Sequence, residues 1–290
     1  MAIEVRSVGP EAFDEIAPLL DALPNEAMSK ADWRWVLFEY PWAACPPRGW
    51  ALYADGRAVG FMGALFSARP LLGRVEKFLS PSCWVVQDKH RYSGALLLRP
   101  MLALEDHTIV ALSPSQLTYK VFAKLGMRPL ETEQLVLPPV PRPAEAARAL
   151  RGSFTVDAEE IRAELTGDER KFCQDMAASP VARHALLRRG DRRCYIVATP
   201  SRKWGVPYAD VQYVGDREFF WEHRILAHAA LTRAMGIAGL ALAVDRRFLV
   251  GRPPPLARRM RMPRLYRPAK EDITPAMIDG LYSEFMGIRV

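Results

Sequence analysis

The sequence of 290 residues contains no run of about 18 uncharged apolar residues, the length that a membrane-spanning helix needs. Its first residues, MAIEVRSVGPEAFDEI, mix acidic, basic and apolar side chains and lack the apolar core of a secretion signal. We therefore expect a cytoplasmic protein without integral membrane association.

Cysteine and histidine are scarce, with four and five residues. The cysteines are far apart and form no C-x-x-C pair: Cys45, Cys83, Cys173 and Cys194. This spacing predicts reduced, mostly buried thiols rather than a disulfide framework. His223 and His228 share a predicted helix, but a separation of five residues puts them on different faces. No metal site is therefore expected.

Acidic residues are the minority, because 33 Asp and Glu stand against 40 Lys and Arg, for a net charge of +7. A basic chain suits an anionic ligand, which leaves nucleic acid, a membrane surface and a phosphorylated cosubstrate open. Residues 252–270 carry seven cations and no acid. We interpret this segment as a basic surface loop stiffened by proline, with nucleic-acid association as the alternative.

Half of the residues are hydrophobic, and in the first half of the chain they alternate between strand-like and helix-like patterns. Asp55-Gly56 between two apolar runs predicts a hairpin turn. The expected elements are strand 3–8, helix 10–23, helix 30–40, hairpin 49–71, strand 83–88, strand 107–113 and helix 116–126.

Prolines divide the chain. Four of them fall within residues 138–143, where they cannot continue a central strand or helix. The succession of strands and helices then repeats more faintly, which predicts an internal duplication. The expected organisation is a first domain at 1–137, a linker at 138–152 and a second domain at 153–290.

The stretch VQDKHRYSGALLL, from Val86 to Leu98, is followed by HTIVALS and YKVFAKLGMRPLE. Together they resemble the GCN5-related N-acetyltransferase (GNAT) family, in which a strand leads into a glycine-containing turn and a helix. The resemblance covers residues 3–131. It implies a mixed α/β fold, a mostly antiparallel sheet with flanking helices, in two tandem GNAT-like domains of which the second is degenerate.

In that family, N–H groups at the start of a helix bind the pyrophosphate of coenzyme A. The resemblance therefore implies acetyl-CoA or another acyl-CoA as cosubstrate. By the same resemblance, backbone contacts to the pantetheine arm fall on strand end 85–87, and the pyrophosphate falls on Arg91, Ser93 and Gly94. The full set of expected cosubstrate-binding residues is Val85, Val86, Gln87, His90, Arg91, Tyr92, Ser93, Gly94, Ala95 and Phe122.

The sequence departs from the family pattern at several positions. Tyr92 and Leu96 stand where many members have glycine, and Pro100 lies inside the expected helix. Phe122 replaces the tyrosine that protonates the leaving thiolate in many members. Tyr119, one turn earlier, is then the candidate acid.

The proton acceptor is open among Asp88, Glu76 and His90. The resemblance implies direct transfer of an acyl group from acyl-CoA to an amine of a small metabolite, without a covalent enzyme intermediate. Two alternatives remain: a catalytically silent binding or regulatory protein, and a nucleic-acid-associated protein. Whether the chain forms a homodimer is open as well.

Overall fold

The structure is a computed structural model. It describes residues 2–23, 25, 27–42, 47–131, 133–203, 205–254 and 256–288. The chain forms two units, each with its own seven-stranded sheet. Unit 1 contains the chain up to Pro129 together with Arg264–Met277 and Tyr282–Ile288, and unit 2 contains Leu130–Pro263 and Ile278–Leu281.

The sheet of unit 1 is antiparallel except for the pair β4–β5. The predicted hairpin turn is present between β2 and β3, where Asp55 and Gly56 both have positive φ. In spatial order the strands are β1 (Ile3–Val8), β2 (Gly49–Ala54), β3 (Arg57–Leu71), β4 (Arg74–Val86), β5 (His107–Ala111), β14 (Leu265–Arg267) and β6 (Arg128–Pro129).

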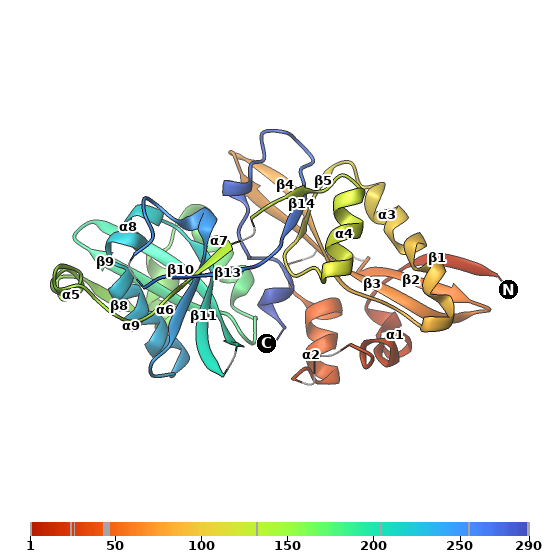
Figure 1. The fold of residues 1–290 in the computed structure, drawn as a ribbon, viewed down its shortest axis with the longest axis horizontal. Helices are drawn as coiled ribbons and strands as arrows, with labels where there is room; N and C mark the ends of the chain where they lie inside the picture. The colour runs from red at the N-terminus through yellow and green to blue at the C-terminus, as the bar shows by residue number, and fades with distance from the viewer. Residues whose placement is uncertain are drawn as a thin grey trace. The chain divides into compact units, whose positions relative to one another are not determined.

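Helices cover both faces of this sheet (Figure 1). They are α1 (Phe13–Leu20), α2 (Lys30–Arg34), α3 (Leu98–Leu102) and α4 (Gln116–Lys124). Side chains alternate along each strand, so β2 sends Ala51 and Tyr53 into the core with α1 and α2. Trp50 and Leu52 enter the core with α3 and α4.

Unit 2 repeats this design. Its strands, in spatial order, are β13 (Arg258–Arg261), β7 (Glu133–Leu137), β12 (Ala241–Asp245), β11 (Val206–Val214), β10 (Arg192–Lys203), β9 (Arg183–Arg189) and β8 (Ser153–Thr155). The pair β11–β12 is the parallel one. The helices are α5 (Pro143–Ala149), α6 (Ala158–Glu164), α7 (Gly167–Met176), α8 (Arg217–Glu222) and α9 (Arg224–Met235).

The two sheets have the same order, with one strand exchanged in each. Next to the parallel pair, unit 1 holds β14, which comes from the end of the chain. At the matching position unit 2 holds β7, which precedes the other strands of unit 2 in the sequence. The mixed α/β, tandem architecture agrees with the sequence analysis. The unit boundaries differ from 1–137 and 153–290, and the expected linker 138–152 contains helix α5.

The basic segment 252–270 was expected to be a loop, and the structure corrects this. It contains β13 and β14, because its apolar residues Met260 and Leu265 are buried in the two sheets. Several of its cations also bind within unit 1. Arg267 donates to the carbonyls of Leu102 and Leu104, and Lys270 bonds to Glu76.

Two other elements differ from expectation. β4 begins at Arg74 rather than at Cys83, since its first half contains charged residues that hide the strand pattern. The predicted helix that His223 and His228 share is interrupted at His223, where α8 ends and α9 begins.

In the described ranges, no helix is long and apolar enough to cross a membrane. Cys173 and Cys194 are buried free thiols and Cys83 is half-buried, whereas Cys45 lies outside the described residues.

We predict that residues 1–137 alone do not fold as unit 1, because the place between β5 and β6 stays empty and β7 is left without its sheet. Joining residues 1–129 to residues 264–288 through a flexible Gly/Ser linker should restore cooperative thermal unfolding by circular dichroism. If residues 1–137 and the joined chain unfolded at the same temperature, β14 would not be needed for the fold of unit 1.

Candidate active site

Unit 1 contains a cavity where its parallel strands separate. β4 and β5 pair only over Lys77–Leu79 and His107–Ile109, after which β4 continues beside β3 while β5 ends at Ala111. The cavity has a volume of about 220 Å³. Its walls include β4, the loop after β5 and the start of α4, so three elements of one unit converge on it.

A β-bulge shapes the β4 wall. Gly63 pairs with Ser82 and Phe61 pairs with Val85, so Cys83 and Trp84 together stand opposite one residue of β3. Cys83 has φ of 54°, a left-handed value that is uncommon for a residue with a side chain. A bulge leaves a backbone group outside the ladder. The strand can therefore offer an N–H to an oxyanion in the cavity.

The bulge also reverses the faces of the strand beyond it. Before the bulge the odd-numbered residues of β4, such as Leu79, point into the core with α3 and α4. After the bulge the even-numbered residues, such as Trp84, point into that core. Trp84 then stacks on Phe122 of α4, with ring centroids 6.3 Å apart and planes inclined by 7°. Both rings line the cavity and narrow it.

A buried carboxylate lies behind the cavity. Glu284 comes from the C-terminal segment of unit 1 and is 2% exposed. Ser80 donates to its Oε2 at 2.9 Å and Ser113 donates to its Oε1 at 2.5 Å. Burial raises the pKa of Glu284 above its ordinary value, although both serine hydrogen bonds act against this. Because Ser113 lines the cavity, one hydroxyl links the carboxylate to it.

The start of α4 faces the same cavity. Ser115 caps the helix by accepting from the Thr118 N–H at 3.1 Å, and the two hydroxyl oxygens are 2.9 Å apart. Both residues line the cavity. The positive end of the helix macrodipole and these hydroxyls can stabilise a negative charge there.

Cys83 also lines this cavity, and its thiol is unsuited to nucleophilic attack. Burial raises the pKa of Cys83 to about 12, so the thiol stays protonated at neutral pH. A covalent route through this residue is therefore disfavoured.

The expected phosphate turn has a different backbone from the one anticipated. Residues Asp88–Leu97 form a 3₁₀ helix, and α3 begins only at Leu98. Pro100 explains the short helix, since it has no N–H to bond to the Leu96 carbonyl and its ring would clash with it. Leu96 does not crowd the turn, because it packs beside Pro100 against a separate cavity of about 420 Å³.

Several expected cosubstrate residues lie on this turn. Asp88, Arg91, Tyr92 and Ala95 are exposed, and Ser93 is half-buried. A side chain on buried Gly94 would come within 3.1 Å of Val86. At the end of β4, Val85 and Val86 remain half-buried, whereas the Gln87 N–H is engaged with the Val59 carbonyl at 2.9 Å.

Two buried polar atoms at the turn have no hydrogen-bond partner among the described residues. They are His90 Nδ1 and Trp84 Nε1. Trp84 Nε1 lies 3.9 Å from the point that a Cβ on Gly94 would occupy. Buried polar groups are rarely left without a partner, so these atoms fit a ligand that carries hydrogen-bonding oxygens, as a pyrophosphate does.

The expected acid and base residues lie elsewhere. Tyr119 is half-buried against the α3 and α4 core and is not among the residues that line the cavity. Glu76 is buried between Lys270 and Arg74, and the hydrogen bond from Lys270 leads in lowering its pKa. It is held as an ion pair and is a poor proton acceptor.

Sequence reasoning missed Glu284, which is 171 positions from Ser113 and carries no local motif. It also missed Ser115 and Thr118, although the helix-capping pattern SPSQLT could have drawn attention to them.

No protein-family model and no curated protein matches the sequence. Solved structures do match. A GCN5-related N-acetyltransferase from Anabaena variabilis aligns with a TM-score of 0.58 and 12% identity over 93% of this chain and 73% of its own. A tandem GNAT protein from the clavulanic acid biosynthesis pathway aligns with a TM-score of 0.53 and 14% identity over 93% and 99%.

The chain has the tandem GNAT fold. A putative acetyltransferase from Pyrococcus horikoshii is also similar, with a TM-score of 0.54 and 13% identity over 99% of this chain and 94% of its own. At these identities the likeness concerns the fold, and the activity has to be argued from the site.

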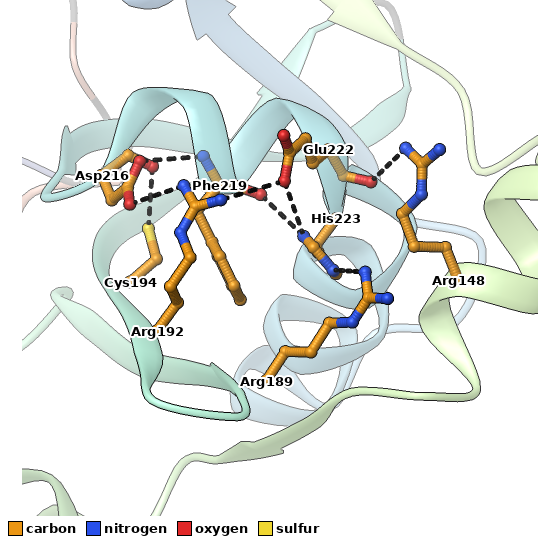
Figure 2. Close-up of polar contacts among 8 residues, drawn as sticks. All are labelled: Arg148, Arg189, Arg192, Cys194, Asp216, Phe219, Glu222 and His223. Atoms are coloured by element: carbon orange, nitrogen blue, oxygen red, sulfur yellow. Dashed lines mark hydrogen bonds and ion pairs between the residues drawn. The ribbon is translucent and has the colours of Figure 1, made fainter.

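In unit 2 the GNAT turn that follows the fourth strand is occupied by carboxylates. Asp216 caps α8 by accepting from the Phe219 N–H at 2.8 Å, and Arg192 binds it at 2.9 Å (Figure 2). Burial acts to raise the pKa of Asp216, but the Phe219 hydrogen bond and Arg192 together lower it. A negative charge at this helix start opposes phosphate binding.

The gap between the parallel strands of unit 2 is bridged by its own chain. The Gly280 N–H donates to the Gln212 carbonyl of β11 at 2.9 Å. Arg247, just after β12, donates to the Ile278 carbonyl at 2.6 Å. Within the described residues, the turn of unit 2 therefore carries a negative charge and the gap between its parallel strands is closed.

Two histidines of unit 2, His223 and His228, are buried. His223 stacks on Phe219 and lies between the Phe219 carbonyl and Arg189, each at 3.1 Å (Figure 2). Burial lowers its pKa, and it lowers the pKa of His228 to about 4. Within the described ranges, no three His, Cys, Asp or Glu side chains are grouped as metal ligands.

We predict that Glu284→Gln changes how stability depends on pH. The folded-state pKa of Glu284 is raised, so its stabilising contribution is present below the ordinary value of 4.5 and is lost as pH rises through the folded pKa. Between pH 5 and pH 8, wild type should lose more thermal stability than the variant. Glu271→Gln, at an exposed position of the same segment, should follow wild type. Parallel curves for wild type and Glu284→Gln would refute the raised pKa.

Proposed function

We propose that the protein is an acyltransferase that moves an acyl group from acyl-CoA, with acetyl-CoA as the first candidate, to a primary amine of a small molecule in the cavity of unit 1. The observation that carries this proposal is the Glu284 carboxylate, linked by Ser113 to a cavity between separated strands. The expected pyrophosphate contacts at Arg91, Ser93 and Gly94 belong to the same proposal.

In the proposed reaction the amine nitrogen attacks the thioester carbonyl. The new C–N bond forms and the C–S bond breaks, and the amine loses one proton, which passes through the Ser113 hydroxyl to Glu284. A carboxylate with a raised pKa is a stronger base than an ordinary one, which favours this transfer near neutral pH. The bulged strand at Cys83 donates an N–H to the oxyanion.

The leaving thiolate carries a negative charge. In our proposal the start of α4 stabilises that charge with its dipole and the Ser115 and Thr118 hydroxyls. The thiolate then takes a proton from solvent. This arrangement needs no tyrosine at position 122, so Phe122 is compatible with activity and Tyr119 is a secondary candidate.

A second candidate function is a silent binding protein that keeps the fold. The stacked pair Trp84–Phe122 favours it, because the cavity of about 220 Å³ is smaller than the roughly 300–1,000 Å³ of most ligand sites. Acyl-CoA binding would then require these rings to separate.

Cosubstrate binding can be tested by thermal unfolding. Acetyl-CoA at about a hundredfold over its Kd should stabilise the protein by about 2.7 kcal/mol, a rise in Tm of roughly 5–10 °C. Arg91→Glu should abolish the rise, because it places a negative charge at the proposed pyrophosphate site. Arg57→Glu, an equally exposed change at the β2–β3 hairpin, should keep it. No rise in wild type at millimolar acetyl-CoA would favour the silent protein.

Proton transfer can be tested separately with Glu284→Gln. We expect kcat to fall about 10²–10⁴-fold, measured as free thiol released from acetyl-CoA with a panel of primary amines. The thermal shift with acetyl-CoA should persist in the variant, and Glu271→Gln should keep full activity. Unchanged turnover in Glu284→Gln would exclude this carboxylate as the proton acceptor.

A further inference from the structure

Another cavity is lined only by residues of unit 2 and lies on the sheet face opposite the main core of that unit. Leu135 and Leu137 of β7 pack into that main core, whereas Val136 between them packs with Tyr208 and Ala241 on the other face. The cavity there has a volume of about 720 Å³, within the range of small-molecule sites. It is open to a ligand from solvent.

The cavity is lined mainly by apolar side chains, several of them unusually exposed. Leu256 is 67% exposed, Val140 52% and Val206 45%. Their exposure at one site marks an apolar surface that a ligand can cover. Ala241 lies among them, and its short side chain leaves room above β12.

Charge is confined to one end of this groove. The charged residues among its walls are Arg258 and Arg259, both on the edge strand β13. Arg258 pairs with Val136 and shares its face of the sheet, and within the described residues its side chain has no hydrogen bond or ion pair. Arg259 pairs with Leu135, so its side chain leaves β13 toward the other face, 3.7 Å from the Glu133 carboxylate. The other end, at Val206 and Tyr208 of β11, is apolar.

The groove crosses four strands of the sheet. Its walls come from β11, β12, β7 and β13, which are neighbours in that order and span about 14 Å at the usual strand spacing. A peptide lying there would bury backbone N–H and C=O groups against apolar side chains without partners, which is costly. A hydrocarbon chain has no such groups.

A second copy of the chain also fits poorly. Antiparallel pairing of β13 with β13 of another copy would bring Arg258 opposite Arg261, and like charges directly opposite destabilise a strand pair. A single anionic group at the β13 end would instead complement Arg258, which lies on the groove face of the sheet.

We propose that this groove binds a monomeric fatty carboxylate, with its chain lying across β11, β12 and β7 and its carboxylate at Arg258. This binding site is separate from the acyl-transfer cavity of unit 1 and does not depend on the proposed acyltransferase activity. Asp216 occupies the turn of unit 2 at which a coenzyme A pyrophosphate would bind. In our proposal unit 2 therefore binds a fatty carboxylate in place of acyl-CoA.

The test is displacement of a dansyl-labelled undecanoic acid from the full-length protein by laurate, below the concentration at which laurate forms micelles. Saturable displacement is expected for wild type. Leu256→Asp and Val140→Asp should abolish it, because each puts a charge among the groove's apolar walls. Leu256 has positive φ, a conformation that Asp tolerates well. Leu150→Asp, at an 87% exposed apolar residue outside the groove, should bind as wild type.

The charged end is tested with the variant Arg258→Ala. Laurate binding should weaken about tenfold or more, while 1-dodecanol, which lacks the carboxylate, should displace the probe equally from wild type and the variant. Laurate binding that survives Leu256→Asp, or that weakens equally in Leu150→Asp, would overturn the assignment. Capture of the protein by phosphatidylglycerol vesicles without binding of monomeric laurate would overturn it too, in favour of a membrane contact.

Discussion

Each sheet depends on an interior strand that comes from a distant part of the sequence. In unit 1, β14 pairs with β5 on one side and with β6 on the other, and Leu265 at its start is fully buried. Without it, β5 would become an edge with unpaired backbone groups beside a hydrophobic core. Burial of β14 also fixes the following segment in unit 1, and with it Glu284. The proposed proton acceptor thus exists only because the strand is exchanged.

The two units show how one fold can offer or withhold a site. In unit 1 the parallel strands separate, a bulge at Cys83 redirects β4, and the gap holds a cavity with Ser113 and Glu284. In unit 2 residues 278–281 bond across the matching gap, and Asp216 neutralises the start of α8. The difference lies in a few charges and in one bridging segment, while the strand order is the same.

The basic charge of the chain has two separate uses. Lys270 and Arg267 hold the C-terminal segment to unit 1 through Glu76 and two carbonyls. Arg258, only a few residues earlier, faces an apolar groove in unit 2. Cations that look like one run in the sequence therefore belong to different units. In the folded chain the described part of segment 252–270 contains two strands and is not a free basic arm.

The sequence by itself determined the local elements with strong patterns and the class of fold. The hairpin at Asp55-Gly56, the helix that begins at Gln116 and the strand 107–111 follow from turn chemistry and from the periodicity of apolar residues. Their succession was enough to identify the tandem GNAT fold. These signals are local, so one stretch of chain contains all the information that they need.

Only the tertiary structure decided the strand exchange, the bulge and the buried carboxylate. Positions 265–267 read as part of a basic loop because a three-residue strand has too short a pattern to detect, and its partners lie more than a hundred residues away. Pro100 signalled an interruption, but not that the turn would be a 3₁₀ helix. Glu284 resembles any acidic residue until Ser80 and Ser113 close over it, because burial and its effect on pKa arise from contacts that the sequence does not order.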